Sequence, residues 1–332
     1  MTEIRVLSSE EVDGLAKPAE YVSRVREGYI ERGTGAPAKP RTALLNRDPA
    51  GMLTTYGAVL PERGVMGGYM YSAGFGSGDA WFVTPLFDAE SGELRAIIDG
   101  ASMNPFKTGA AGAVAVDALA RQDATDVGLF GSGPQARGQL RATSTVRDLE
   151  RVRVYSPTRD HRERFAEEMD EELVADVDAV PNSEETVAGA DIVITATDAS
   201  EPVFDGGSLE AGTHVTAMGQ YHPQKREIDA TTVERSIYVP DLRARVSQDA
   251  GAFLLAGEAG VIDEDHVHAE LGEVLVGDAP GRTAREQVTV FDSGGTGIET
   301  VAAASLLYDR AKSADLGTVL EFAPASEALT GR

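Results

Sequence analysis

The chain has 332 residues, of which 42% are apolar, and its 54 acidic and 30 basic side chains give a formal net charge of −24. This length predicts two domains, and so acidic a surface disfavours nucleic acids and anionic membranes as partners. The absence of cysteine excludes disulfides, thiolate nucleophiles and cysteine-bound metals. Because no apolar run reaches about 18 residues and the N-terminus lacks a signal-peptide stretch, we expect a soluble, cytoplasmic protein.

The first hundred residues predict a helix followed by an antiparallel meander. Apolar residues recur at helical spacing over Pro18–Arg32. The β-rich runs that follow are separated by turn sequences and comprise Thr42–Leu45, Met52–Leu60, Val65–Tyr71, Trp81–Phe87 and Leu94–Ile98. Antiparallel sheets of this kind often leave one face open, which here is a candidate pocket lining or dimer contact.

The pattern changes at Thr108, which is a candidate N-cap for a helix that runs to about Gln122. The first turns of this helix consist almost entirely of glycine and alanine. Small side chains allow close approach of backbones. The helix is therefore expected to pack tightly or to lie beside a ligand.

From about Asp126 strands alternate with helices, which is typical of a parallel sheet covered on both faces. The predicted strands are Val127–Phe130, Val152–Tyr155, Val174–Val177, Ile192–Ala196, His214–Met218, Ile237–Val239 and Val288–Phe291. Helices are predicted over Gln135–Thr145, Asp160–Glu168 and Gly297–Ala311, and the last of these is expected to return to the first domain. The fold class is thus α/β, with a doubly wound Rossmann domain over residues 113–299. An α+β domain with an antiparallel sheet covers residues 1–112 and 300–332.

The strongest local motif follows the strand Val127–Phe130 and reads G-x-G-x-x-A from Gly131 through Ser132 and Gly133 to Ala136. The first glycine permits a tight turn, the second lets a pyrophosphate approach the backbone, and the alanine lets the helix pack on the strand. Free N–H groups at the start of the helix favour a phosphate. The motif predicts a dinucleotide site, against the alternative of an ordinary glycine-rich turn.

The end of the next strand indicates which dinucleotide binds. NAD-binding proteins usually place an acidic residue there for the ribose hydroxyl, whereas this chain has Ser156, Thr158 and Arg159. Two hydroxyls and a guanidinium suit a 2′-phosphate. We therefore predict NADP(H) in preference to NAD(H). The alternative is that Arg159 is only a solvated residue in the first turn of the following helix, and in that case NAD(H) stays possible.

Several segments together resemble the ornithine cyclodeaminase/mu-crystallin family, which includes alanine dehydrogenases and ketimine or imine reductases. The similarity extends from about Pro40 to Tyr308 and rests on PRTALL, NPFKTGAAGAVAVDALA, GLFGSGPQARGQL, GADIVITATDASEPVF, GQYHPQKREID and TVFDSGGTGIE. The resemblance implies a homodimer or larger assembly with an N-terminal domain for substrate binding and dimerisation. It also implies a small amino or imino acid as the substrate.

The resemblance implies that Arg41 holds the substrate carboxylate, a role that suits a guanidinium fork. Three positions depart from the family pattern. Tyr69 stands where a substrate-contacting lysine is usual, Lys107 replaces an arginine at the start of a helix, and Tyr221 replaces the catalytic aspartate. A phenol titrates near about 10, so the neighbouring His222, with an ordinary pKa near about 6.5, is the better acid or base at neutral pH.

The resemblance also implies further cofactor contacts at the carboxyl ends of the parallel strands, where such ligands bind. They are Thr108, Gln135, Thr195, Ala196, Thr197, Ala217, Met218, Lys225 and Ser293. Asp292 occupies a position where many relatives have lysine, which the acidic surface bias of the chain would explain. The remaining histidines predict no metal site, since His266 and His268 are two residues apart and would point to different faces of a helix.

These features favour an NADP(H)-dependent oxidoreductase acting on a carboxylate-bearing imine or amino acid. Arg41 and Lys107 would bind the carboxylate, and His222 or Tyr221 would handle the proton, with Lys107 and Tyr69 as further catalytic candidates. Ornithine cyclodeaminase or alanine dehydrogenase activity is one alternative. A non-catalytic NADPH-binding protein is another, because three family positions are replaced.

The basic residues add a hypothesis about origin. Only five of the 30 are lysine, and the rest are arginine. An acidic surface that is poor in lysine suits a high-salt cytoplasm, where ions screen the repulsion between like charges. The composition therefore favours a halophilic source.

Overall fold

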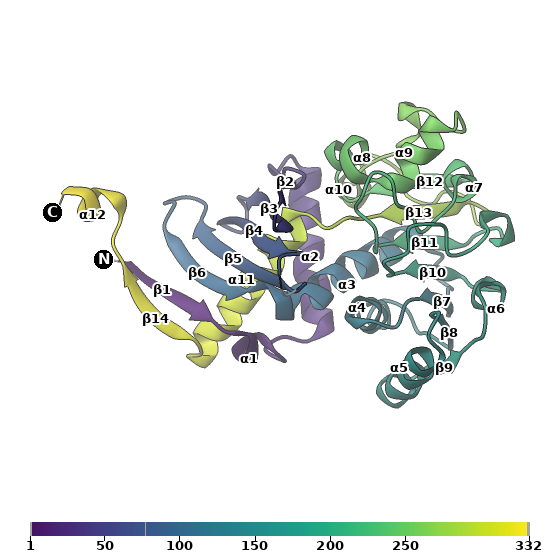
Figure 1. Cartoon of the computed structure of the whole chain (residues 1–332), viewed down its shortest axis with the longest axis horizontal. Coiled ribbons are helices and arrows are strands. Elements are labelled where there is room, and N and C mark those ends of the chain that lie inside the picture. Colours follow the sequence, from purple (N-terminus) through teal and green to yellow (C-terminus); the bar gives the residue numbers. More distant parts are fainter. Residues whose placement is uncertain (1, 77, 331–332) are drawn as a thin grey trace. The chain divides into compact units, whose positions relative to one another are not determined.

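The computed structural model describes residues 2–76 and 78–330 and divides into two compact units. Unit 1 comprises Met1–Lys107 and Thr296–Arg332, and unit 2 comprises Thr108–Gly295. Each unit has its own seven-stranded sheet (Figure 1). Among the described residues, no helix is both long and apolar enough to cross a membrane.

The sheet of unit 1 has the strand order β14-β1-β6-β5-β4-β3-β2. The strands are β1 (Thr2–Leu7), β2 (Thr42–Arg47), β3 (Ala50–Leu60), β4 (Val65–Ala73), β5 (Ala80–Asp88), β6 (Leu94–Asp99) and β14 (Thr318–Phe322). Strands β2 to β6 pair antiparallel in sequence order, which confirms the predicted meander. The sheet as a whole is mixed, because β1 pairs parallel with β6 and antiparallel with β14.

Helices cover one face of this sheet. Besides the short α1 (Ser9–Val12) and α12 (Ala325–Thr330), unit 1 contains α2 (Pro18–Gly33) and α11 (Gly297–Ala314), which pack against each other and against β3. The close approach of α11 depends on glycine, since a Cβ on Gly297 would lie 2.2 Å from the carbonyl carbon of Gly57. Residues at alternate positions of the strands, such as Leu60, Val65 and Leu86, are fully buried on this inner face.

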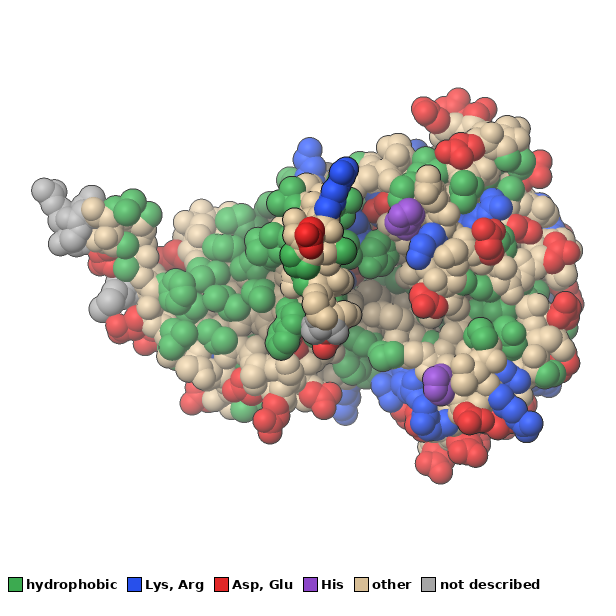
Figure 2. Space-filling view, viewed as in Figure 1, with side chains coloured by type: hydrophobic (Ala, Val, Ile, Leu, Met, Phe, Trp, Pro, Cys, Tyr) green, Lys and Arg blue, Asp and Glu red, His purple; other side chains and the backbone are tan. Residues whose placement is uncertain are grey.

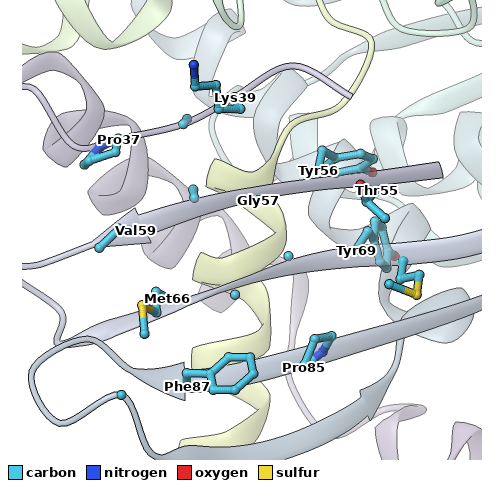
Figure 3. A pocket seen from close by; sticks show the side chains of 16 residues that line it. Pro37, Lys39, Thr55, Tyr56, Gly57, Val59, Met66, Tyr69, Pro85 and Phe87 are labelled. Atoms are coloured by element: carbon cyan, nitrogen blue, oxygen red, sulfur yellow. The ribbon is translucent and has the colours of Figure 1, made fainter. Parts of the chain in front are cut away.

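The opposite face of the sheet, which we call the outer face, carries large apolar side chains that remain exposed. They belong to neighbouring strands and comprise Leu44, Leu53, Met70, Trp81 and Val83. Figure 2 shows hydrophobic side chains gathered over the strands of unit 1. A groove of 680 Å³ lies within this face, where Gly57 and Gly68 leave space between Val59, Met66 and Phe87 (Figure 3).

Unit 2 is the predicted doubly wound domain. Its strands are β7 (Asp126–Phe130), β8 (Arg151–Tyr155), β9 (Asp176–Ala179), β10 (Ile192–Thr195), β11 (His214–Ala217), β12 (Ser236–Pro240) and β13 (Val288–Asp292). All seven pair in parallel, in the order β12-β13-β11-β10-β7-β8-β9. The order reverses between β7 and β10, which is the position where doubly wound sheets bind nucleotides.

Two apolar cores, one on each face of the sheet, hold unit 2 together. Adjacent residues of β10 divide between them, because Val193 belongs to one core while Ile192 and Ile194 belong to the other. The helices are α4 (Pro134–Thr143), α5 (Arg159–Glu172), α6 (Ser183–Val187), α7 (Ala230–Glu234), α8 (Arg243–Asp249), α9 (Gly251–Glu258) and α10 (Leu271–Val276), with 3-10 turns η1 (Gly206–Ser208) and η2 (Glu264–His266).

Helix α3 (Gly100–Leu119) begins eight residues before the predicted N-cap, so the expectation for Thr108 is wrong. The carboxylate of Asp99 accepts the N–H of Ser102 at 2.9 Å and so satisfies a free donor at the true start of the helix. The expected tight packing is present further along. A Cβ on Gly109 would lie 2.2 Å from the carbonyl oxygen of Gly138 in α4, so only glycine fits there.

Candidate functional site

The glycine loop after β7 has the geometry of a phosphate cradle. Gly131 has a φ of +114°, and a Cβ there would lie 2.5 Å from the carbonyl oxygen of Ala196. Gly133 is the N-cap of α4, and a Cβ at this position would meet no atom within 4 Å. Ala136 is fully buried. The loop therefore opens into free space in front of the N–H groups of α4, which fits a dinucleotide phosphate.

Backbone hydrogen bonds place the strand-end loops of unit 2 side by side. The N–H of Ala196 donates to Phe130 at 2.9 Å, that of Met218 to Thr195 at 3.0 Å, and that of Ser293 to Ala217 at 3.0 Å. The predicted contacts on the loops after β7, β10, β11 and β13 thus form one row. We call this row the carboxyl edge of unit 2. Lys225 lies against it, since it lines a small cavity together with Ala217.

Helix α3 reaches the start of α4 through side chains. The hydroxyl of Thr108 donates to the Oε1 atom of Gln135, and the Nε2 atom of Gln139 donates to the carbonyl oxygen of Thr108 at 2.8 Å. Gln139 is completely buried and was not predicted. Two predicted cofactor residues, Thr108 and Gln135, are therefore in direct contact beside the glycine loop.

Hydroxyl and guanidinium groups meet after β8. The Oγ of Ser132 donates to the Oγ of Ser156 at 3.0 Å. Thr158 is the N-cap of α5, and Arg159 is the first residue of that helix, 75% exposed and paired with Glu163 at 2.6 Å. Figure 2 shows basic side chains gathered in the region that α5 occupies in Figure 1.

The sequence interpretation missed Arg162 in this cluster. Its Nη1 donates to the carbonyl oxygen of Ser156 at 2.9 Å, and its guanidinium lies 5.6 Å from the centre of the Tyr155 ring. Arg162 is three residues after Arg159, a spacing that places both on one face of a helix. That spacing was the signal that could have identified it.

The loop after β11 carries the two candidates for proton transfer. The side chain of Tyr221 is 42% exposed, and His222 is also exposed. The Nδ1 atom of His222 accepts the N–H of Gln224 at 3.1 Å, so a neutral imidazole carries its proton on Nε2. A Cβ on Gly294 would lie 3.1 Å from the Cβ of Tyr221, which brings this loop beside the one after β13. Which of the two side chains acts stays a prediction.

Asp292 is buried, so surface bias does not explain it and that interpretation is wrong. It accepts the hydroxyl of Tyr238 at 2.5 Å and pairs with Arg245, which is itself buried. Arg245 also pairs with Asp241 at 2.8 Å, and Asp241 accepts the hydroxyl of Ser293 at 2.7 Å. The charge of Asp292 therefore belongs to an internal network that holds the loop carrying Ser293.

Unit 1 contains a second cluster, in which two cations lie near the same aromatic ring. The guanidinium of Arg41 lies 5.5 Å from the centre of the Tyr56 ring, and the Nζ atom of Lys107 lies 5.9 Å from it. Arg41 donates to the hydroxyl of Tyr71 at 3.4 Å, and Lys107 lies 4.7 Å from the centre of the Tyr69 ring. The predicted carboxylate-binding residues therefore share an aromatic environment, which we call the cation cluster of unit 1.

Glu299 is the carboxylate of this cluster and was not predicted. It lies 3.5 Å from Lys107, and both side chains are 1% exposed. Its position follows from a capping box at the start of α11, where it also accepts the hydroxyl of Thr296 at 2.5 Å. The sequence signal was the T-x-x-E pattern, which identifies a helix start but does not reveal that Lys107 meets it.

Tyr69 is buried in the cation cluster. Its hydroxyl donates to the carbonyl oxygen of Gly100, and its side chain is 2% exposed. Burial raises the pKa of Tyr69 well above its ordinary value of 10, so the phenol is neutral at physiological pH. Whether Tyr69 takes part in catalysis stays a prediction.

A family model described as "Ornithine cyclodeaminase/mu-crystallin family" matches residues 3–315. The Delta(1)-pyrroline-2-carboxylate reductase of Bacillus cereus is 31% identical over 241 residues, which are 72% of this chain and 74% of that protein.

Two solved structures show the same fold. The Delta(1)-pyrroline-2-carboxylate reductase of Thermococcus litoralis, in complex with NADH and L-proline, has a TM-score of 0.90 and 31% identity over 95% of this chain and 99% of that one. An archaeal alanine dehydrogenase dimer with bound NAD has a TM-score of 0.89 and 30% identity over 97% of this chain and 100% of that one. The family model spans nearly all of the described residues, and the chain belongs to the ornithine cyclodeaminase/mu-crystallin family.

Proposed function

We propose that the protein is an NADP(H)-dependent oxidoreductase that reduces a carboxylate-bearing imine to the amino acid, or catalyses the reverse oxidation. The observation that carries this proposal is the row of loops at the carboxyl edge of unit 2, which begins at the open phosphate cradle of Gly131 and Gly133. Similar structures bind NADH or NAD, one of them together with L-proline. Unit 2 would hold the cofactor, and unit 1 would supply the groups for the substrate carboxylate.

The residues of the chain would divide the work as follows. Arg41 would bind the substrate carboxylate through two parallel hydrogen bonds, because its guanidinium is a planar fork. Lys107 would add positive charge, and the aromatic rings around both cations would exclude water. When bound, the nicotinamide cofactor supplies or accepts the hydride. His222, with its proton on Nε2, or Tyr221 would provide the proton that the imine nitrogen needs.

The preference for NADP(H) rests on the loop after β8. Ser156 and Thr158 follow this strand in place of an acidic residue, and Arg162 contacts the same loop. A 2′-phosphate suits such a group of donors, whereas an acidic residue would repel it. Titration of cofactor fluorescence with NADPH and NADH tests the preference. A dissociation constant at least about ten-fold lower for NADPH is expected, and equal constants would contradict it.

Turnover tests the activity itself. We expect NADPH oxidation with cyclic imino acids or with pyruvate plus ammonia. Release of ammonia and formation of proline from ornithine, without net change in the cofactor, would instead favour ornithine cyclodeaminase. Turnover of pyruvate plus ammonia, with no turnover of cyclic imino acids, would favour alanine dehydrogenase. Tight NADPH binding with no turnover of any of these compounds would favour the non-catalytic alternative.

We also propose that the protein is a homodimer that uses the outer face of unit 1. Exposed apolar patches of this kind mark interfaces, and two sheets can pack face to face. Light scattering is expected to give the mass of two chains. Met70→Glu should reduce it to one chain, while Leu45→Glu, on the other side of β2, should leave it unchanged. A wild-type mass of one chain would overturn the proposal.

A further inference from the structure

Glu227 is a buried carboxylate that the assignments above do not use. It follows the loop that carries Tyr221 and His222, and it is 2% exposed. Burial is the main reason why its pKa lies above the ordinary value for glutamate. A buried charge destabilises the folded state unless hydrogen bonds compensate it. The hydrogen-bond partners of this carboxylate therefore indicate its role.

Those partners are neutral donors on two separate loops of the carboxyl edge. The Oε1 atom accepts the N–H of Thr197 at 2.7 Å and its hydroxyl at 2.6 Å. The Oε2 atom accepts the hydroxyl of Thr195 at 3.0 Å and the N–H of Gly219 at 2.7 Å. The carboxylate therefore bridges the loop after β10 and the loop after β11. Each of its oxygens takes two hydrogen bonds, which only an ionised carboxylate can accept in full.

The two loops are in contact at the point where Glu227 joins them. A Cβ on Gly219 would lie 2.2 Å from the carbonyl oxygen of Thr197 and 2.5 Å from the Oε1 atom of Glu227. The backbone adds a link, since the N–H of Val203 donates to the carbonyl oxygen of Glu227 at 2.8 Å. The side chain of Glu227 and the lack of a side chain on Gly219 thus set the spacing between the loops together.

We infer that Glu227 is a positioning residue, which sets the loop that begins at Gly219, and with it Tyr221 and His222, relative to the loop Thr195–Thr197. This role rests on the proposed function, because that function assigns the proton to the first loop and a cofactor contact to the second. An offset of about 1 Å between reacting groups can lower a rate about 100-fold, so a rigid link has a direct effect on turnover.

Glu227→Gln tests the link, because the amide keeps the size of the side chain but has one acceptor oxygen in place of two. Hydrogen exchange measured by mass spectrometry should show at least ten-fold faster exchange in peptides that cover residues 195–199 and 219–224. A peptide that covers residues 127–133 should be unchanged. The single acceptor of the amide can still serve one of the two loops, so unchanged exchange in both of these peptides is the result that would overturn the inference.

Asp229→Asn is the matched control. Asp229 also accepts hydrogen bonds from neutral donors, namely Thr232 at 2.8 Å and Gly206 at 2.9 Å, but these bonds cap α7 and reach the start of η1, and they contact neither the segment 195–199 nor the segment 219–224. This variant should lower the thermal midpoint and leave kcat unchanged. Glu227→Gln should lower kcat at least ten-fold with a change of less than three-fold in the dissociation constant of NADPH. Equal kcat in both variants would refute a positioning role.

If Glu227→Gln does not fold, Thr197→Val removes one donor and should speed exchange in the 195–199 peptide alone. Failure to do so would also count against the inference. The exchange measurement needs no substrate, so it separates the two proposals. If the wild-type protein turns over no imine but Glu227→Gln still exchanges faster than the wild type in these loops, the proposed function fails and the link stands.

Discussion

The carboxyl edge of unit 2 and the cation cluster of unit 1 are built from different kinds of groups. The carboxyl edge of unit 2 relies on backbone N–H groups, glycines and strand-end loops. The cation cluster of unit 1 relies on the side chains of Arg41, Lys107 and Glu299 among aromatic rings. A site built from backbone tolerates many substitutions, whereas a site built from charged side chains changes its chemistry with each one. Of the three positions expected from the sequence to depart from the family pattern, Tyr69 and Lys107 lie in the second kind of site, and Tyr221 lies on a loop of the first.

The largest effect is expected at Arg41, to which the proposed function assigns the hydrogen bonds to the substrate carboxylate. Arg41→Ala should lower kcat/KM for an imino acid by about 100-fold or more, because the substrate carboxylate loses its charged partner. The dissociation constant of NADPH should stay within about two-fold, since the proposed function assigns the cofactor to unit 2. Arg47→Ala serves as the control, because Arg47 is an exposed arginine at the end of β2, the strand that follows Arg41. A loss confined to cofactor binding would break the proposed division of labour.

Lys107→Met should destabilise unit 1 by about 3–5 kcal/mol, because it leaves Glu299 buried without its cation. Urea denaturation followed by circular dichroism measures the free energy of unfolding. The double variant Lys107→Met/Glu299→Gln should recover most of the loss. If the double variant is no more stable than the single one, the pair is not what holds this cluster.

Arg162→Ala should raise the dissociation constant of NADPH about ten-fold and change that of NADH less than about two-fold, because only NADPH carries the 2′-phosphate. Arg159→Ala should have a smaller effect, since that side chain is exposed and paired with Glu163. Arg164→Ala, exposed on the same helix, is the control. A similar rise for both cofactors would show that Arg162 supports the loop rather than the phosphate.

The interior of unit 2 predicts a dependence of stability on pH. Burial lowers the pKa of His214 from 6.5 to about 3, and its ring bonds the hydroxyls of Thr216 and Thr289. The unfolded chain therefore binds a proton more readily between these values, so stability falls as pH drops from about 6.5 towards 3. The contribution is at most about 1.4 kcal/mol per pH unit. Urea unfolding should show a shallower decline for His214→Gln, and an identical slope would argue against a neutral buried imidazole.

The smallest expected effect concerns the acidic composition of the whole chain. We propose that the acidic composition reflects a halophilic source. Raising KCl from 0.1 to 2 M shortens the Debye length from about 10 Å to a far smaller value, so the repulsion between acidic side chains is screened. The thermal midpoint should then rise by several degrees. Sodium chloride at equal ionic strength controls for a specific effect of potassium. A midpoint that does not respond to molar salt would remove the halophilic hypothesis.

Local patterns were sufficient for much of this protein. All seven strands of unit 2 follow from apolar runs between turn residues, and the phosphate cradle follows from Gly131 and Gly133, because both signals lie within a few neighbouring residues. The same reasoning predicted the meander of unit 1. It failed at the start of α3. The helix begins at Gly100, where the carboxylate of Asp99 accepts the N–H of Ser102, and not after Thr108.

Tertiary structure alone decided the pairings between distant residues. The sequence by itself indicates neither that Lys107 meets Glu299, nor that Glu227 bridges two loops, nor that Asp292 is buried against Arg245. Strand β1 likewise exists through its pairing with β6 and β14. The physical reason is common to all of them. The energy of a buried charge or an added strand depends on its partner, and a partner far along the chain leaves no periodicity for the sequence to show.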